Sequence, residues 1–218
     1  MVTKRSARLP AAPQGKNPVR ARILEAAFSA FTQRGFADTS TLEIATRARA
    51  SKRELYAEFH SKQDMLVACI RGRAERLKLP VDLPDIGDRA NLERALVAFG
   101  TQLLREVSDP TVVAVFRLAI SEAFRAPEVA HALNDVAFAT SRGALREIMR
   151  RAAAAGLVDG EPADMAEQFF GLLWGSKLLG LLLNINERPS VREIAVRAEK
   201  AASAFLLAHP APGVALER

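Results

Sequence analysis

Apolar residues recur every three to four positions through most of the 218-residue chain, and runs that alternate apolar with polar residues are nearly absent. Such a period is that of an amphipathic helix, whereas a period of two would indicate a strand. Prolines and glycines divide the pattern into segments. We therefore predict an all-α fold with helices over residues 18–34, 41–47, 52–59, 61–78, 89–107, 110–124, 127–155, 162–183 and 190–208.

The segment 39–62 holds two short amphipathic helices that each open with Ser-x-x-Glu. In such a capping box the serine oxygen accepts from a backbone N–H three residues on, and the glutamate reaches back to the serine N–H. The two boxes are Ser40–Glu43 and Ser51–Glu54. Helices this short are not stable alone. They must pack on each other and on a third helix, which is the arrangement of a helix-turn-helix.

The second of these helices carries charge that a purely structural helix would not need. Lys52 and Arg53 fall in its first turn, where the helix dipole already presents positive charge, so each costs roughly 0.3–1 kcal/mol. A bound anion offsets that cost, and a phosphate backbone would serve. Tyr56 also projects away from the core residues Leu55 and Phe59. This face is therefore free to meet a polyanion.

Basic residues concentrate in the first third of the chain. The formal charge of the whole chain is +6, but residues 1–78 hold 16 Lys and Arg against 7 Asp and Glu, while residues 79–218 hold 15 against 18. The asymmetry favours nucleic acid as the partner of the first third over a merely solvated face. Residues 1–16 contain four basic residues and no acidic one. We expect a disordered arm there, which either touches DNA or is a solvated tail.

The segment resembles the DNA-binding signature of the TetR (tetracycline-repressor-like) family of transcriptional regulators. The residues that carry the resemblance are Thr41, Ile44, Ala45, Ala48, Ser51, Leu55, Tyr56, Phe59, Ser61 and Lys62. It implies an N-terminal three-helix helix-turn-helix DNA-binding domain and a C-terminal helical ligand-binding and dimerisation domain. The resemblance and the charge of this segment together lead us to predict as DNA-contacting residues Thr41, Arg49, Ser51, Lys52, Arg53, Tyr56 and Lys62.

Two positions depart from the family's pattern. The turn between the two short helices commonly has glycine where this chain has Arg49, and a non-glycine residue in a left-handed turn costs on the order of 1 kcal/mol. Arg49 either takes another turn geometry or recovers the cost by contacting phosphate. Ala57 and Glu58 stand where the family often has an aromatic residue and a histidine that reach DNA. A glutamate there is a poor partner for phosphate.

Pro- and Gly-containing residues 79–88 break the helical pattern and mark a boundary. We divide the chain into a disordered basic arm (1–16), a helix-turn-helix DNA-binding domain (17–62) and a helical ligand-binding and dimerisation domain (63–218). Residues 172–183 are apolar on nearly all sides, and Gly171 and Gly175 permit close backbone approach. A second copy of the chain is the natural cover, the alternative being the buried central helix of a monomer. The resemblance likewise implies a homodimer through the last two long helices.

Several aromatic residues fall on helices that surround a cavity in such regulators. As a ligand pocket we predict Phe116, Phe138, Phe170, Trp174 and Lys177. For each aromatic residue, ordinary core packing is the more frequent role. Nothing in the pattern selects a ligand beyond a small apolar or amphipathic molecule.

Other classes of function find little support. His60, His131 and His209 are far apart and form no metal-binding spacing, and no nucleophile elbow or phosphate loop occurs, so we predict no enzyme, metal or cofactor. Cys69 is the only cysteine, which fits a reducing cytoplasm. Residues 1–16 lack the apolar core of a signal peptide. The longest apolar run, 169–185, contains Lys177, so a membrane span is not expected.

We therefore interpret the chain as a homodimeric, sequence-specific transcriptional regulator, by resemblance a repressor that a ligand releases from a palindromic operator. The two recognition helices would lie about 34–36 Å apart on one face of the double helix. Two alternatives remain. One is a small-molecule-binding or scaffolding dimer whose DNA-binding head has lost specific binding. The other is a helical enzyme or membrane-associated protein, against which the absence of catalytic clusters argues.

Overall fold

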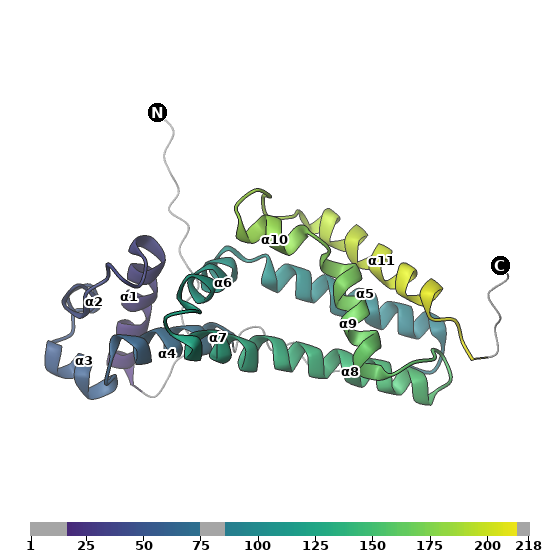
Figure 1. The fold of residues 1–218 in the computed structure, drawn as a ribbon, viewed down its shortest axis with the longest axis horizontal. Helices are drawn as coiled ribbons and strands as arrows, with labels where there is room; N and C mark the ends of the chain where they lie inside the picture. Colours follow the sequence, from purple (N-terminus) through teal and green to yellow (C-terminus); the bar gives the residue numbers. More distant parts are fainter. Residues whose placement is uncertain (1–16, 75–85, 213–218) are drawn as a thin grey trace. The chain divides into compact units, whose positions relative to one another are not determined.

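The computed structural model describes residues 17–74 and 86–212, and every regular element within them is a helix (Figure 1). This confirms the all-α prediction. The chain divides into two compact units, Met1–Cys69 and Ile70–Arg218. The predicted basic arm, the end of the helix expected over 61–78 and most of the segment 79–88 lie outside the described residues. No described helix combines the length and apolarity needed to cross a membrane.

The N-terminal unit consists of α1 (Pro18–Arg34), α2 (Thr41–Ala48), α3 (Lys52–Glu58) and most of α4 (Lys62–Ala74). α1 begins and ends where predicted, because the Asn17 side chain accepts from the Val19 N–H at 3.0 Å and Gly35 takes a φ of 83°. Both α2 and α3 pack against α1. The core of this unit holds large side chains that are fully buried, namely Ile23, Phe31, Ile44, Leu55, Met65 and Leu66.

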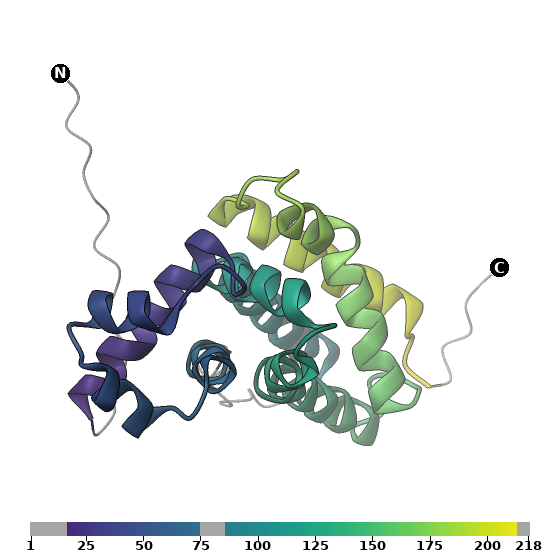
Figure 2. The same ribbon diagram turned by 60° about the vertical axis from the view of Figure 1, so that its left-hand side comes forward.

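The C-terminal unit is organised around its first and last helices. Its elements are α5 (Arg89–Val107), α6 (Pro110–Glu122), α7 (Pro127–Leu133), the π-helical turn η2 (Asn134–Phe138), α8 (Ala139–Ala154), α9 (Pro162–Trp174), α10 (Lys177–Leu182) and α11 (Val191–Ala208). Figures 1 and 2 show α11 running along α5, while α9 passes from α8 to α11. Gly100 permits this close packing, because a Cβ there would lie 3.0 Å from Leu173 Cδ1.

The helix expected over 127–155 is continuous but not regular. Residues Asn134–Phe138 form a π-helical turn between α7 and α8. A π turn inserts one extra residue per turn and so rotates the side chains that follow it. It brings Phe138 to the start of α8, a placement that a uniform helical period does not predict.

The prediction of a single helix over 162–183 is wrong, because the helix ends at Trp174 and a new one begins at Lys177. Gly175 has φ 47° and ψ −132°, a conformation that glycine tolerates and other residues do not. The Arg197 guanidinium donates to the carbonyl oxygens of Leu173 and Leu172 at 2.8 and 2.9 Å, and so satisfies the end of α9. Gly175 therefore separates α9 from α10 rather than serving close packing of one long helix.

Candidate DNA-binding surface and ligand pocket

α3 presents two different faces. Leu55 is fully buried and Phe59, at the end of the helix, is 2% exposed, so both anchor it to the core. Lys52, Arg53 and Tyr56 are exposed on the other face, and no described residue accepts a hydrogen bond or ion pair from Lys52 or Arg53. The helix is thus held by one side and leaves two cations and a phenol in solvent.

The start of α3 is fixed by the capping box that the sequence predicts. The Ser51 N–H donates to Glu54 Oε2 at 2.7 Å, and the Glu54 N–H donates to Ser51 Oγ at 3.1 Å. The hydrogen bonds from the Ser51 N–H and hydroxyl lower the pKa of the Glu54 carboxyl. The box therefore holds Lys52 and Arg53 in the first turn of a stable helix, next to the positive end of its dipole.

The box predicted for α2 forms only in part. Ser40 Oγ accepts from the Glu43 N–H at 3.1 Å, which confirms the N-cap. The Glu43 carboxylate, however, pairs with Arg47 at 2.7 Å and with Arg34 at 3.3 Å. These two guanidinium groups take the carboxylate in place of the Ser40 N–H, so the prediction of the reciprocal half of the box is wrong.

A polar edge joins α2 to α3. The Tyr56 hydroxyl lies 3.4 Å from Thr41 Oγ1, and the Lys52 ammonium lies 6.0 Å from the centre of the Tyr56 ring. Three of the residues predicted to contact DNA thus stand next to one another although they come from two helices. Such an edge is suited to holding a phosphate group between hydroxyl donors and a cation.

Arg49 occupies the left-handed turn that the family usually gives to glycine. Its φ and ψ are 50° and 46°. The Arg49 N–H donates to the Thr46 carbonyl at 3.2 Å and the Ala50 N–H to the Ala45 carbonyl at 3.0 Å, which is the Schellman pattern of helix ends. The first of the two alternatives, a different turn geometry, is therefore excluded. The Arg49 side chain is exposed beside α3.

Glu58 is used inside the N-terminal unit. Its carboxylate accepts a hydrogen bond from the Asn17 side-chain amide and lies 3.7 Å from Arg20. Arg20 also donates to the Glu58 backbone oxygen at 3.0 Å and covers the Phe59 ring, 4.3 Å from its centre. The residue that departs from the family's pattern thus ties the end of α3 to the start of α1.

Lys62 is also used inside the unit. Its ammonium donates to the backbone oxygens of Phe36, Thr39 and Ala37 at 2.7, 3.0 and 3.3 Å. An ammonium has three protons, and these three carbonyls take all of them. These bonds give Lys62 the task of closing the loop between α1 and α2, while its contact with phosphate stays a prediction.

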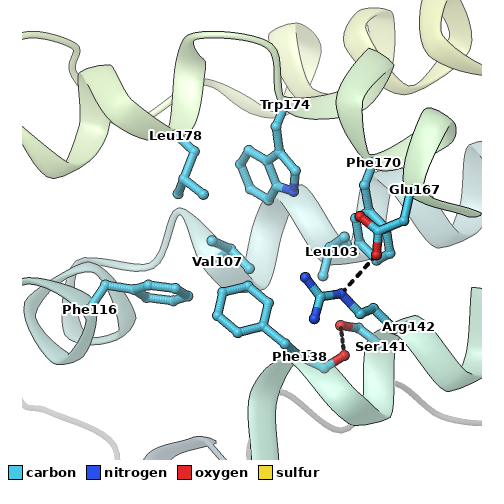
Figure 3. Close-up of a pocket in the computed structure, with 10 residues that line it drawn as sticks. All are labelled: Leu103, Val107, Phe116, Phe138, Ser141, Arg142, Glu167, Phe170, Trp174 and Leu178. Atoms are coloured by element: carbon cyan, nitrogen blue, oxygen red, sulfur yellow. Dashed lines mark hydrogen bonds and ion pairs between the residues drawn. The ribbon is translucent and has the colours of Figure 1, made fainter. Parts of the chain in front are cut away.

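The C-terminal unit contains a partly open cavity of about 160 Å³ between α5, α6, η2, α8, α9 and α10 (Figure 3). Four of the five residues predicted for a ligand pocket lie on its wall, namely Phe116, Phe138, Phe170 and Trp174. The rest of the wall consists of Leu103, Val107, Ser141, Arg142, Glu167 and Leu178. The rings of Phe116 and Phe138 meet edge to face with their centres 5.6 Å apart. The wall is largely apolar and aromatic.

Lys177 does not reach this cavity. It lies instead on an open groove of about 630 Å³ between the end of α9, α10 and α11, together with Arg188, Arg192 and Lys200. Because Gly175 breaks the helix, α10 starts in a new direction and carries Leu178 rather than Lys177 to the cavity wall. Trp174 borders both spaces.

Three polar residues of the cavity wall were not predicted. Ser141 is buried and donates to the Phe138 carbonyl at 3.2 Å, and Arg142 Nε lies 3.1 Å from Glu167 Oε1. The sequence around Arg142 and Glu167 is that of ordinary amphipathic helices, in which charged residues usually face solvent. Only the packing of α8 against α9 brings the two together.

Several large apolar side chains of α9, α10, α11 and the segment before α11 stay exposed within the protomer. α9 buries Met165, Ala166, Phe169 and Leu173 against its own unit. The apolar side chains that remain exposed on these helices and the connecting segment are Leu172, Leu179, Leu183, Ile185, Val191, Val196 and Leu207. Such a surface suits a second protein chain. Among the described residues there is no group of three or more metal-ligating side chains.

Comparisons with known proteins agree with this geometry. The family model described as bacterial regulatory proteins, tetR family, matches residues 23–69. The family model described as AefR-like transcriptional repressor, C-terminal domain, matches residues 94–210, which is more than half of the chain. A comparison with curated proteins gives no match.

Solved structures of the same fold span nearly the whole chain. The structure of the flavonoid-responsive regulator FrrA is 29% identical, with a TM-score of 0.75 over 90% of this chain and 98% of that one. A TetR transcriptional regulator from Agrobacterium tumefaciens is 23% identical, with a TM-score of 0.78 over 90% of this chain and 96% of that one. At this lower identity the second comparison concerns the fold alone.

Proposed function

This chain belongs to the TetR family and is a DNA-binding transcriptional regulator, and from that premise we propose that it is a homodimeric repressor released from its operator by a small apolar or amphipathic ligand. The observation that carries the proposal is the free cationic face of α3. Leu55 and Phe59 bind this helix to the core, while Lys52 and Arg53 have no hydrogen-bonding or ion-pair partner among the described residues. A regulator of this kind acts in the cytoplasm, where the chromosome lies.

In the proposed complex α3 enters the major groove. Arg53 and Lys52 contact bases or phosphates from the first turn, where a helix fits most closely into the groove. Tyr56 and Thr41, whose hydroxyl oxygens lie 3.4 Å apart, contact one stretch of backbone. Arg49 contacts phosphate from the left-handed turn. Ser51 supports the contact mainly through its capping box, and Lys62 supports it by holding the loop between α1 and α2.

The homodimer forms through α9 and α11 in this proposal. The exposed side chains Leu172, Val196 and Leu207 support it, since burying them against a second copy removes apolar surface from water. Two copies place two recognition helices on a palindromic operator, about one turn of the double helix apart.

The ligand binds in the cavity that Phe116, Phe138 and Trp174 line. The relative FrrA is named for its response to flavonoids, which supports an aromatic effector for a cavity lined by aromatic rings. A ligand shifts the regulator away from DNA only by binding the DNA-free state more tightly than the DNA-bound state. Relief of repression is that difference in affinity.

A gel-shift experiment tests the proposal. Duplex DNA from the region beside the protein's own gene is compared with a scrambled duplex of equal length and composition. Retardation of the first at much lower protein concentration supports a sequence-specific regulator. Equal retardation of both contradicts it and favours the small-molecule-binding or scaffolding dimer instead.

A further inference from the structure

Arg142 is the one cation among the described residues that line the cavity of the C-terminal unit. It projects from the first turns of α8 between the rings of Phe138 and Phe170 (Figure 3). Its guanidinium carbon lies 5.5 Å from the centre of the Phe138 ring. The Arg142 side chain is partly exposed and already faces the Glu167 carboxylate, so the guanidinium nitrogens that Glu167 leaves free decide which anion the cavity can accept.

Only one edge of the guanidinium is occupied. Arg142 Nε pairs with Glu167 Oε1 at 3.1 Å, and no described residue accepts from either terminal nitrogen. Figure 3 shows these nitrogens directed away from Glu167, toward Val107 and the Phe138 ring. Two parallel N–H groups of this kind match the two oxygens of a carboxylate, which they bind more strongly than a neutral acceptor.

The size of the cavity limits the rest of the ligand. Its volume is about 160 Å³, and a protein cavity of roughly 150 Å³ is known to hold one benzene molecule. The rings of Phe116, Phe138 and Trp174 provide flat apolar walls for such a ring. In this conformation the cavity has room for one aromatic ring with a small substituent.

We propose that this cavity recognises a single-ring aromatic carboxylate, with the ring between Phe116, Phe138 and Trp174 and the carboxylate on the terminal nitrogens of Arg142. The inference rests on the proposed function, since it names the class of the releasing ligand. Glu167 keeps the Nε edge and so fixes the direction of the guanidinium. Arg142 is therefore the residue that distinguishes an acid from its neutral counterpart.

The test uses the full chain with benzoate and benzamide as probes, which have the same shape but differ in charge. Trp174 is the only tryptophan and lines the cavity, so its fluorescence reports occupancy. We expect wild-type protein to bind benzoate about tenfold more tightly than benzamide, the ratio that one charge-assisted pair supports. Arg142→Gln should reduce benzoate affinity to that of benzamide and leave benzamide binding unchanged.

Two further variants separate the effect of the Arg142 guanidinium from effects of charge alone and of a nearby cation. The Arg142–Glu167 pair is 40% and 55% exposed in its two side chains, so its loss should not unfold the protein. Arg142→Lys keeps the charge but not the planar pair of donors and should retain only part of the preference. Arg146→Gln removes an exposed cation one turn further along α8 and should change neither affinity.

The proposal is overturned if wild-type protein binds both probes equally, if the preference survives in Arg142→Gln, or if benzoate does not bind up to its solubility limit. A further measurement with toluene, a ring without a carboxylate, distinguishes failure of this proposal from failure of the proposed function. If toluene occupies the cavity and releases the protein from DNA, ligand-controlled repression stands and only the carboxylate is wrong. If the protein does not bind operator DNA at all, the proposed function itself fails, whatever the cavity binds.

Discussion

The ammonium of Lys62, at the start of α4, lies 2.7 Å from the backbone oxygen of Phe36, just after the end of α1, and so closes the loop that leads into α2. Its two other protons go to Ala37 and Thr39. A cation that looks from the sequence like a phosphate contact thus holds the N-terminal unit together. Its removal should lower the stability of this unit more than it changes the salt dependence of DNA binding.

Lys62→Ala should lower the free energy of unfolding by about 1–3 kcal/mol, because charged hydrogen bonds to three carbonyls are lost. The dependence of DNA affinity on salt should keep its slope. Lys52→Ala is the matched control, since its exposed ammonium has no hydrogen-bonding partner among the described residues. That variant should keep or slightly gain stability, because Lys52 opposes the helix dipole, and should lose about one unit of salt slope. A fall of the slope in Lys62→Ala would show that Lys62 contacts phosphate after all.

Arg49→Gly should stabilise the N-terminal unit by on the order of 1 kcal/mol, because glycine takes the left-handed conformation at φ 50° without steric cost. The same change removes an exposed cation beside α3, so affinity for DNA should fall. Urea unfolding and a gel shift measure the two effects. Unchanged DNA affinity would refute the phosphate contact of Arg49 while leaving the stability argument intact.

Gly175→Ala should destabilise the C-terminal unit by about 1–3 kcal/mol, since the backbone conformation after α9 is strained for any side chain. The added Cβ would also lie 2.9 Å from Arg197 Nη2, the group that satisfies the end of α9. Gly143→Ala is the control, because a Cβ at this exposed position of α8 would meet nothing within 4 Å. It should be neutral or stabilising by up to about 1 kcal/mol, and equal melting temperatures for the two variants would contradict the account.

Lowering the pH should weaken the ion pairs that Glu147 forms with Arg150 and Arg151 on α8. Hydrogen bonds from Arg150 and then Arg151 lower the pKa of the Glu147 carboxyl to about 2 from its ordinary 4.5. A folded-state pKa below the unfolded value stabilises the folded state above pH 4.5, and this contribution disappears as the pH falls toward 2. The melting temperature of Glu147→Gln should therefore lie slightly below that of wild type at neutral pH, and the gap should close in acid. A gap that stays constant with pH would exclude the ion pair as its cause.

Local signals in the sequence were enough for much of the fold. Ser51 caps the helix that its capping box predicts, and the helices predicted over 18–34 and 190–208 begin at caps formed by Asn17 and Ser190, because capping depends on residues only two or three positions apart. The sequence left two turn geometries open at Arg49, and the structure shows the left-handed one.

Relationships over longer distances in the chain were not accessible in this way. Glu58 meets Asn17 across 41 positions, and Arg142 meets Glu167 only because α8 packs on α9. The sequence around each of these residues looks the same as the sequence around an ordinary solvent-exposed polar residue. The break at Gly175 was missed because glycine also suits close helix packing, and only the backbone conformation separates these two roles.

The claim on which the account depends is that the free face of α3 reads duplex DNA, and Arg53 tests it most directly. Fluorescence anisotropy would compare wild type and Arg53→Ala on the operator duplex and on a scrambled duplex of equal length. If Arg53 reads a base, the variant should lose ~1–3 kcal/mol of binding free energy on the operator and much less on the scrambled duplex. Equal losses would reduce Arg53 to a phosphate contact, and unchanged binding to both would contradict the proposed role of α3.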